Sequence, residues 1–243
     1  MIDSKKRSVS KAVSWKILGI IILGFLAYSS GRSLGESTIL ALFYHAIMLM
    51  VYFLHERAWN MVSWGKTKGL FIQMTGLSGA GKTTLSRFVA DRLKSKGIQV
   101  ELIDGDEYRT NLCSDLGFSK EDRNTNIRRL GFVASVLARN RVVTIISAIN
   151  PYEEVRDELA TNYGDSKLVY VKAKLDTVVD RDVKGLYAKA LLPEGDPHRI
   201  NNFTGISDPF EEPKSSDLVI KTDEESLEIS AEKLENFILE HIQ

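Results

Sequence analysis

A glycine-rich loop that ends in lysine and threonine carries the clearest chemistry in this sequence. Residues 76–84 read Gly-Leu-Ser-Gly-Ala-Gly-Lys-Thr-Thr, the pattern of a loop that cradles the phosphates of a nucleoside triphosphate. Glycines let successive backbone N–H groups point at one anion, and the helix that follows adds its positive end. We therefore expect Lys82 to reach the β- and γ-phosphates of ATP and the Thr83 hydroxyl to bind Mg²⁺. The predicted ATP-binding residues are Gly76, Leu77, Ser78, Gly79, Ala80, Gly81, Lys82, Thr83 and Thr84.

Two carboxylates follow the next apolar run of the sequence. Asp104 and Asp106 flank Gly105 directly after residues 100–103, a short run suited to a buried strand. At the carboxyl end of a strand beside the phosphate-loop strand, such side chains face the crevice in which ligands bind. A kinase needs a carboxylate there to accept a hydroxyl proton or to orient a water on Mg²⁺. We therefore predict Lys82, Asp104 and Asp106 as catalytic residues, while a simple turn and helix cap is the alternative for the two carboxylates.

The apolar runs around these residues have the pattern of an α/β domain. A buried strand over residues 70–75 leads into the phosphate loop, and a helix over 85–94 follows it. The remaining short apolar runs alternate with helical stretches, which predicts a five-stranded parallel sheet. The runs cover residues 142–149, 168–171 and 218–220, and the helical stretches include 123–139 and 225–242. The expected fold class is α/β, a P-loop NTPase-type parallel sheet flanked by helices.

The first quarter of the chain has a different character. Apolar runs cover residues 17–28 and 39–54, and the short polar stretch 29–37 separates them. Two such runs predict a two-helix transmembrane hairpin that precedes the α/β domain. A cleaved signal peptide and a buried helical hairpin of a soluble protein are the alternatives. His45 interrupts the second run, and the sequence leaves a functional role for it open.

Basic residues gather at both ends of the predicted hairpin. Residues 5–16 contain five Lys or Arg, and Arg57, Lys66 and Lys68 follow the second run, whereas Arg32 alone lies between the runs. Basic residues favour the cytoplasmic side, so we expect both ends of the hairpin there. The predicted domains are a membrane hairpin over residues 1–66 and a kinase domain over residues 67–243, the latter beside the cytosolic ATP.

The overall composition argues against two other classes of protein. Lys plus Arg and Asp plus Glu both number 32 in 243 residues, so the net charge gives no indication of a nucleic-acid partner. The single cysteine, Cys113, rules out an intramolecular disulfide framework, and we expect it to be structural.

Further motifs resemble those of adenylyl-sulfate kinases, from residue 70 to residue 243. Beyond the phosphate loop, the resemblance is carried by residues 104–109, 115–119, 122–129, 184–187, 203–206 and 208–213. It implies phosphorylation of adenylyl sulfate on the ribose 3′-hydroxyl, with ATP as donor and Mg²⁺ as cofactor. It also implies that Phe118 and Phe203 stack on the adenine, that arginines hold the phosphosulfate, and that Lys184 belongs to a lid. The acceptor-binding residues that it implies are Asp106, Arg109, Phe118, Arg123, Asn126, Ile127, Ile149, Lys184 and Phe203.

The N-terminal segment resembles small bacterial two-helix membrane modules of unknown function. The likeness is carried by residues 12–19 and 52–60. The expected location is therefore the bacterial inner membrane, as a multi-pass protein with a cytoplasmic kinase domain. The hairpin could anchor the chain, form a homodimer or hold a partner from sulfate assimilation, and the sequence does not choose among these.

Some positions depart from the usual adenylyl-sulfate kinase pattern. Glu107, Asn150 and Glu153 replace the residues common in the family, and the lid segment 191–202 is longer than its commonest form. These departures loosen the identity of the acceptor, so a kinase for another small nucleotide ester or for a sugar acid is an alternative. A non-catalytic membrane nucleotide sensor or scaffold is an alternative of another class. The presence of both Lys82 and Asp106 argues against it.

Overall fold

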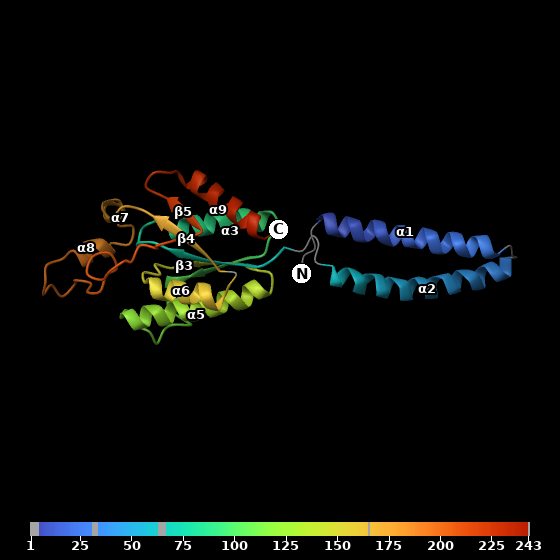
Figure 1. Ribbon diagram of the computed structural model, residues 1–243, viewed down its shortest axis with the longest axis horizontal. Coiled ribbons are helices and arrows are strands. Elements are labelled where there is room, and N and C mark those ends of the chain that lie inside the picture. The colour runs from blue at the N-terminus through green and yellow to red at the C-terminus, as the bar shows by residue number, and fades with distance from the viewer. Residues whose placement is uncertain (1–4, 31–33, 63–66, 165, 243) are drawn as a thin grey trace. The chain divides into compact units, whose positions relative to one another are not determined.

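The computed structural model describes residues 5–30, 34–62, 67–164 and 166–242 of the chain. The chain divides into two compact units, Met1–Lys66 and Thr67–Gln243. Figure 1 shows the first as a pair of long helices and the second as a sheet with helices on both faces. The phosphate loop and both predicted carboxylates belong to the second unit.

The second unit is built on a five-stranded sheet in the order β2-β3-β1-β4-β5, with every described pairing parallel. The predicted five-stranded parallel sheet is therefore confirmed. The central strand β1 (Leu70–Thr75) is buried along its whole length, as a strand covered on both faces must be. The others are β2 (Val100–Asp104), β3 (Val143–Ser147), β4 (Ser166–Lys172) and β5 (Leu218–Lys221). The carboxyl ends of β1, β2 and β3 meet at one edge, where the functional residues follow them.

Four longer helices cover the two faces of this sheet (Figure 1). Helices α3 (Lys82–Ser95) and α9 (Leu227–His241) pack together on one face. Helices α5 (Lys120–Arg139) and α6 (Glu153–Asn162) cover the other face. Each face encloses its own apolar core, one around Ile72, Leu85 and Leu93 and the other around Phe71 and Leu130.

Three short helices lie at the edge of the sheet where the strands end. These are α4 (Gly105–Arg109), α7 (Leu175–Arg181) and α8 (Leu186–Ala190). Helix α4 starts directly after β2 because the Asp104 carboxylate accepts a hydrogen bond from the backbone N–H of Asp106 at 3.0 Å. The helix-cap reading of Asp104 thus holds alongside any chemical role.

Two helices begin a few residues away from the positions predicted from the apolar pattern, because a serine caps each of them. Helix α5 starts at Lys120, before the predicted position 123, because the Ser119 hydroxyl accepts the Asp122 N–H at 3.1 Å. Helix α9 starts at Leu227, after the predicted position 225, because Ser226 caps it through the N–H of Ile229. Polar caps rather than apolar spacing therefore determine where these helices begin.

The first unit consists of α1 (Lys5–Ser30) and α2 (Leu34–Met61), which pack side by side. The predicted polar stretch 29–37 is mostly helical, and its residues 31–33 lie outside the described part, as does the side chain of His45. Polar side chains meet between the helices: the Ser14 hydroxyl lies 2.9 Å from Nε2 of His55, and Lys11 pairs with Glu56 at 2.9 Å.

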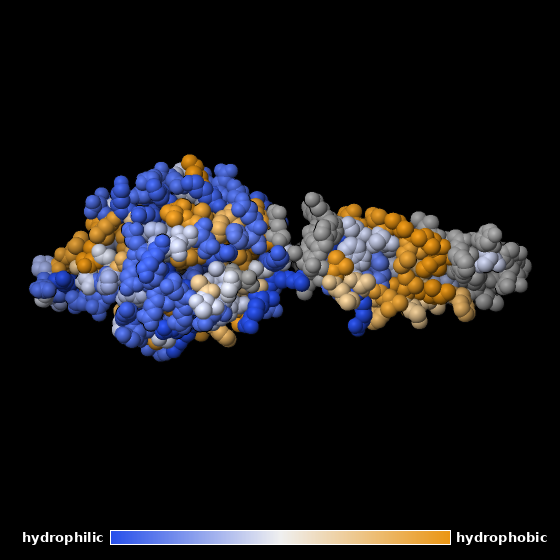
Figure 2. Space-filling view, in the orientation of Figure 1, coloured by the Kyte–Doolittle hydropathy of each residue, from blue (hydrophilic) through white to orange (hydrophobic). Residues whose placement is uncertain are grey.

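Large apolar side chains of this unit face outward instead. Val9, Val13, Ile17 and Ile21, at a spacing of four residues, form one exposed stripe on α1, each more than half accessible. Figure 2 shows apolar surface along both helices and a mostly hydrophilic surface on the α/β unit. No helix in the described part of the chain reaches the combined length and hydropathy of a membrane span.

Candidate active site

The phosphate loop connects β1 to α3 through backbone conformations that suit glycine. Gly79 and Gly81 have φ values of 74° and 92°, in the left-handed region that side chains disfavour. A Cβ at Gly76 would lie 2.3 Å from the carbonyl oxygen of Val171, so β4 also approaches too closely for any larger residue. The loop therefore places its N–H groups directly before the positive end of α3.

Lys82 is buried and folds back over this loop. Its Nζ donates to the carbonyl oxygens of Gly76 and Leu77, both at 2.8 Å. The pKa of Lys82 is lowered to about 7, chiefly by burial and also by nearby Lys184, while Asp106 and Asp104 oppose the shift. An anionic phosphate at the loop would supply the counter-charge that the buried ammonium group lacks.

A cluster of three oxygen donors stands beside the first turn of α3. The Thr83 hydroxyl donates to Oδ2 of Asp104 at 3.0 Å and lies 3.2 Å from the Ser147 hydroxyl. Asp104 and Ser147 are adjacent because they are paired in the register of β2 with β3. Hydroxyl and carboxylate oxygens next to a phosphate site are the donors that Mg²⁺ prefers, so these residues fit that cation. Across the described residues, no group of three His, Cys, Asp or Glu forms an alternative metal site.

Ser147 is a candidate that the sequence analysis missed. It ends the buried strand β3 and is itself buried, so the apolar run absorbed it as a core residue. The available signal was topological: in a parallel sheet, the last residue of the strand between β1 and β2 must lie beside the ends of both.

A small cavity next to the oxygen cluster brings most of the predicted acceptor residues together. Its volume is about 80 Å³, and its walls come from helix α4, Phe118, the first half of α5 and the segment after β3. The predicted residues that line it are Asp106, Arg109, Phe118, Arg123, Asn126, Ile127 and Ile149. Asn150 also lines this cavity, whereas Glu107 is exposed in the first turn of α4 and does not.

Two arginines flank the aromatic ring of Phe118 in this cavity. The guanidinium carbons of Arg109 and Arg123 lie 4.7 and 5.6 Å from the ring centroid. Burial lowers the pKa of Arg109, and the charge of Arg123 adds to the effect. Phe118 is 61% exposed, so its side chain is accessible to a planar ligand. The pair of cations beside it suits an anionic group on the same ligand.

Lys184 and Phe203 lie outside the lining of this cavity. The Lys184 ammonium group forms an ion pair with the Asp106 carboxylate, and both groups are exposed. Phe203 is buried, and its ring packs edge-to-face on Tyr187 with the centroids 4.9 Å apart. The structure thus brings Lys184 to the predicted catalytic carboxylate and packs Phe203 against Tyr187.

The unusual residues Asn150 and Glu153 both have structural partners. The Asn150 amide is buried and donates to Oε1 of Gln73 at 3.2 Å. The Glu153 carboxylate pairs with the buried guanidinium of Arg156, which also donates to the backbone carbonyl of Glu211 at 2.7 Å. Glu153 therefore helps to hold two loops together.

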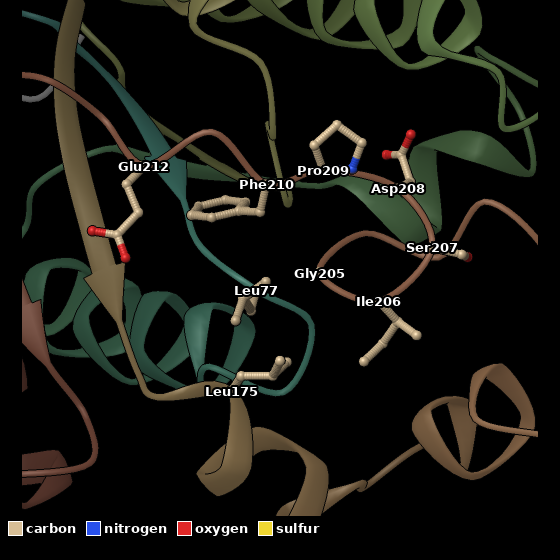
Figure 3. Close-up of a pocket in the computed structure, with 9 residues that line it drawn as sticks. All are labelled: Leu77, Leu175, Gly205, Ile206, Ser207, Asp208, Pro209, Phe210 and Glu212. Atoms are coloured by element: carbon tan, nitrogen blue, oxygen red, sulfur yellow. The ribbon is translucent and has the colours of Figure 1, made fainter.

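A second, larger cavity lies on the outer side of the phosphate loop. It has a volume of about 440 Å³, and Figure 3 shows Leu77 and Leu175 on one side of it and the segment 205–212 on the other. Its lining is largely apolar and backbone, apart from the carboxylates of Asp208 and Glu212. The phosphate loop, through Leu77, thus lines this cavity together with the segment that follows Phe203.

Comparison with known proteins gives the same picture for both units. Residues 68–221 match the family model of adenylylsulphate kinase, and residues 9–60 match that of a predicted membrane protein family, DUF2061. An adenylyl-sulfate kinase of Picosynechococcus sp. is 50% identical to this chain, and the match covers 69% of this chain and 92% of the relative. An adenylyl-sulfate kinase of Halothermothrix orenii is also 50% identical, and the match covers 71% of this chain and 91% of the relative.

A solved structure agrees with these matches. The APS kinase CysC of Mycobacterium tuberculosis, in complex with AMPPNP and APS, superimposes with a TM-score of 0.65 at 38% identity, covering 71% of this chain and 98% of that one. Together with the phosphate loop, the oxygen cluster and the arginine-lined cavity, these matches show that the chain belongs to the adenylyl-sulfate kinase family.

Proposed function

We propose that this protein transfers the γ-phosphoryl group of ATP to the ribose 3′-hydroxyl of adenylyl sulfate, giving 3′-phosphoadenylyl sulfate and ADP. The observation that carries the proposal is the position of Asp106. Asp106 lines the arginine-lined cavity, and its charge also acts on Lys82 in the phosphate loop. A carboxylate at that junction can contact an acceptor hydroxyl while the donor phosphates rest on the loop.

On the donor side, the loop amides and Lys82 hold the phosphates of ATP. Thr83, with Asp104 and Ser147 behind it, is the group that would hold Mg²⁺. When bound, Mg²⁺ neutralises charge on the β- and γ-phosphates. Asp104 is fixed for this role because its other oxygen accepts the N–H of Asp106.

On the acceptor side, Phe118 stacks on the adenine, and Arg109 and Arg123 hold the phosphosulfate. The 3′-oxygen attacks the γ-phosphorus, the bond from that phosphorus to the β,γ-bridging oxygen breaks, and ADP leaves. Asp106 aligns the hydroxyl and accepts its proton. Lys184, now paired with Asp106, is free to exchange that partner for a substrate anion because both side chains are exposed.

Acceptor-dependent ADP release from the purified protein tests this assignment. Adenylyl sulfate, AMP and a sugar acid would be compared at equal concentration with ATP and Mg²⁺. We expect turnover with adenylyl sulfate and at most a trace with the other two. Turnover with the sugar acid instead would assign another acceptor, and ATP binding without turnover on any acceptor would favour a sensor.

We also propose that the first unit is a multi-pass membrane hairpin of the bacterial inner membrane, with the kinase domain in the cytoplasm. Its arrangement supports this location, because polar side chains such as Ser14 and His55 face each other while the stripe Val9, Val13, Ile17 and Ile21 faces outward. A water-soluble helix pair has the opposite arrangement. The apolar part of each helix is short because basic and polar residues occupy the beginning of α1 and the end of α2.

A further inference from the structure

Two side chains donate hydrogen bonds to consecutive carbonyl groups of the phosphate loop. Lys82 donates to the carbonyls of Gly76 and Leu77. Tyr187, from helix α8, donates through its hydroxyl to the next carbonyl, the backbone oxygen of Ser78, at 2.9 Å. Three consecutive carbonyl groups of the loop therefore accept hydrogen bonds from two different side chains.

Tyr187 is held rigidly where it makes this contact. The side chain is 2% exposed, and its backbone N–H donates to Oδ1 of Asp182 at 3.0 Å. Burial, with a smaller effect of Asp182, raises the pKa of Tyr187 to about 12. The phenol is therefore a neutral donor at physiological pH, and its hydrogen bond to Ser78 persists throughout the working range of the enzyme.

The ring of Tyr187 joins this contact to the acceptor side. It meets the ring of Phe203 edge-to-face, at 4.9 Å and 83° between planes. The residue before Phe203 is tied to the acceptor cavity, because Nη2 of Arg123 donates to the carbonyl of Asn202 at 2.6 Å. Arg123 itself lies over Phe118. A shift of Phe203 would thus be passed through Asn202 to Arg123 and Phe118, which line the acceptor cavity.

A second contact joins the phosphate loop directly to this segment. A Cβ at Gly205 would lie 2.7 Å from Cδ2 of Leu77, so the loop side chain packs directly on the backbone of the segment after Phe203. Figure 3 shows Leu77 next to the turn at Gly205. Close packing of this kind transmits displacement because it leaves no slack between the two surfaces.

We propose that Tyr187 is a positioning residue that couples occupancy of the phosphate loop to the affinity of the acceptor cavity. This inference rests on the proposed function. When the donor phosphates bind, Lys82 exchanges the carbonyls of Gly76 and Leu77 for phosphate oxygens, and the loop backbone readjusts. Tyr187 carries that adjustment from Ser78 to Phe203, and so to Arg123 and Phe118. Because coupling of binding is reciprocal, adenylyl sulfate also strengthens the binding of ATP.

The test is a thermodynamic cycle in the full-length protein. The dissociation constant of adenylyl sulfate is measured with and without a saturating non-hydrolysable ATP analogue, and the ratio is the coupling factor. Tyr187→Phe removes only the hydroxyl that contacts Ser78, and Tyr187→Leu also removes the ring edge on Phe203. Tyr163→Phe is the matched control, since Tyr163 packs on Phe71 in the apolar core of the opposite face.

We expect a wild-type coupling factor of about 5 or more. Loss of one hydrogen bond should bring this factor closer to 1, by about 2-fold or more in Tyr187→Phe, and Tyr187→Leu should bring it closer still. The affinity for the ATP analogue alone should change little in Tyr187→Phe, which also confirms that the variant is folded. Tyr163→Phe should keep the wild-type factor.

Two results separate this inference from the proposed function. If the wild-type protein does not bind adenylyl sulfate at all, the proposed function fails and the inference fails with it. If it binds adenylyl sulfate but shows no coupling, or if Tyr187→Phe keeps the full coupling factor, the proposed function stands and the role of Tyr187 is overturned.

Discussion

At the scale of single residues, Lys82 is the group on which the proposed chemistry depends most. It is buried, it touches the loop carbonyls, and it lies within the electrostatic reach of both Asp104 and Asp106. The sequence predicts this residue because the loop pattern is that of a site for the phosphates of a nucleoside triphosphate. Its contacts with the carbonyls of Gly76 and Leu77 could not be predicted, because they depend on the three-dimensional path of the loop.

Replacing Lys82 with alanine should remove charge stabilisation in the transition state. By comparison with removal of one preorganised donor, we expect a loss of at least about 2.7 kcal/mol, or roughly 100-fold in kcat. Single-turnover kinetics with ATP and adenylyl sulfate would measure it, with thermal unfolding as the control for folding. Near-normal turnover would mean that the phosphates bind elsewhere.

The lowered pKa of Lys82 also predicts how stability depends on pH. Between a folded-state pKa of about 7 and the ordinary value of 10.5, the unfolded chain binds a proton that the folded chain does not. The free energy of unfolding that is due to this group therefore rises with pH across that window, and the burial penalty is fully present below it.

Lys82→Met removes the titrating group and keeps the aliphatic volume. We compare the difference in melting temperature, variant minus wild type, at two pH values. We expect this difference to be larger at pH 6 than at pH 10, because only the wild type gains stability as the pH rises. Differential scanning calorimetry of both proteins over this range measures the difference. A difference that stays constant from pH 6 to pH 10 would show that Lys82 remains charged when buried.

At the scale of elements, the sequence predicted the strands better than the residues that connect them. The strand β1 and the loop after it follow from one motif, and the sheet follows from short apolar runs. Ser147 was missed because its neighbours depend on the order of the strands in the sheet, which cannot be predicted from a short stretch of sequence. The contact of Tyr187 with Ser78 joins residues 109 positions apart, so it too is a product of tertiary packing.

The turn after Phe203 offers a test at this scale. Gly205 has a φ of 90°, and an added Cβ would meet Leu77 at 2.7 Å, so Gly205→Ala is both strained and crowded. We expect destabilisation of about 1–3 kcal/mol and a raised KM for adenylyl sulfate, with a smaller change in the KM for ATP. Gly164→Ala is the control, because no atom lies within 4 Å of its added Cβ. Equal effects of the two substitutions would contradict the packing described for Leu77.

At the scale of the whole molecule, the two units differ in what they enclose. The unit Thr67–Gln243 contains two apolar cores and every residue of the proposed active site. The unit Met1–Lys66 buries polar contacts between two helices and exposes apolar ones. The catalytic unit should therefore fold and work by itself, while the hairpin needs an apolar environment.

Expression of residues 67–243 alone tests that division. We expect a soluble protein whose kcat and KM values lie within about 3-fold of those of the full chain, since the described active-site residues all belong to this unit. Steady-state kinetics on both forms measures it, with the full chain in detergent. A truncated protein that folds but loses turnover would show that the hairpin contributes to the active site.

The charge pattern predicts the orientation of the hairpin in the membrane. Five Lys or Arg lie in residues 5–16, Arg57 lies near the end of α2, and Lys66 and Lys68 follow this helix, whereas the connection holds Arg32 alone. Basic residues stay on the cytoplasmic side, so both helices should begin or end there and the kinase domain should share the compartment that holds ATP. A reporter enzyme active only in the periplasm, fused after Gln243, should therefore remain inactive in cells. A second fusion, placed in the connection after Arg32, should be active, and the reverse result for the two fusions would place the kinase domain outside the cytoplasm.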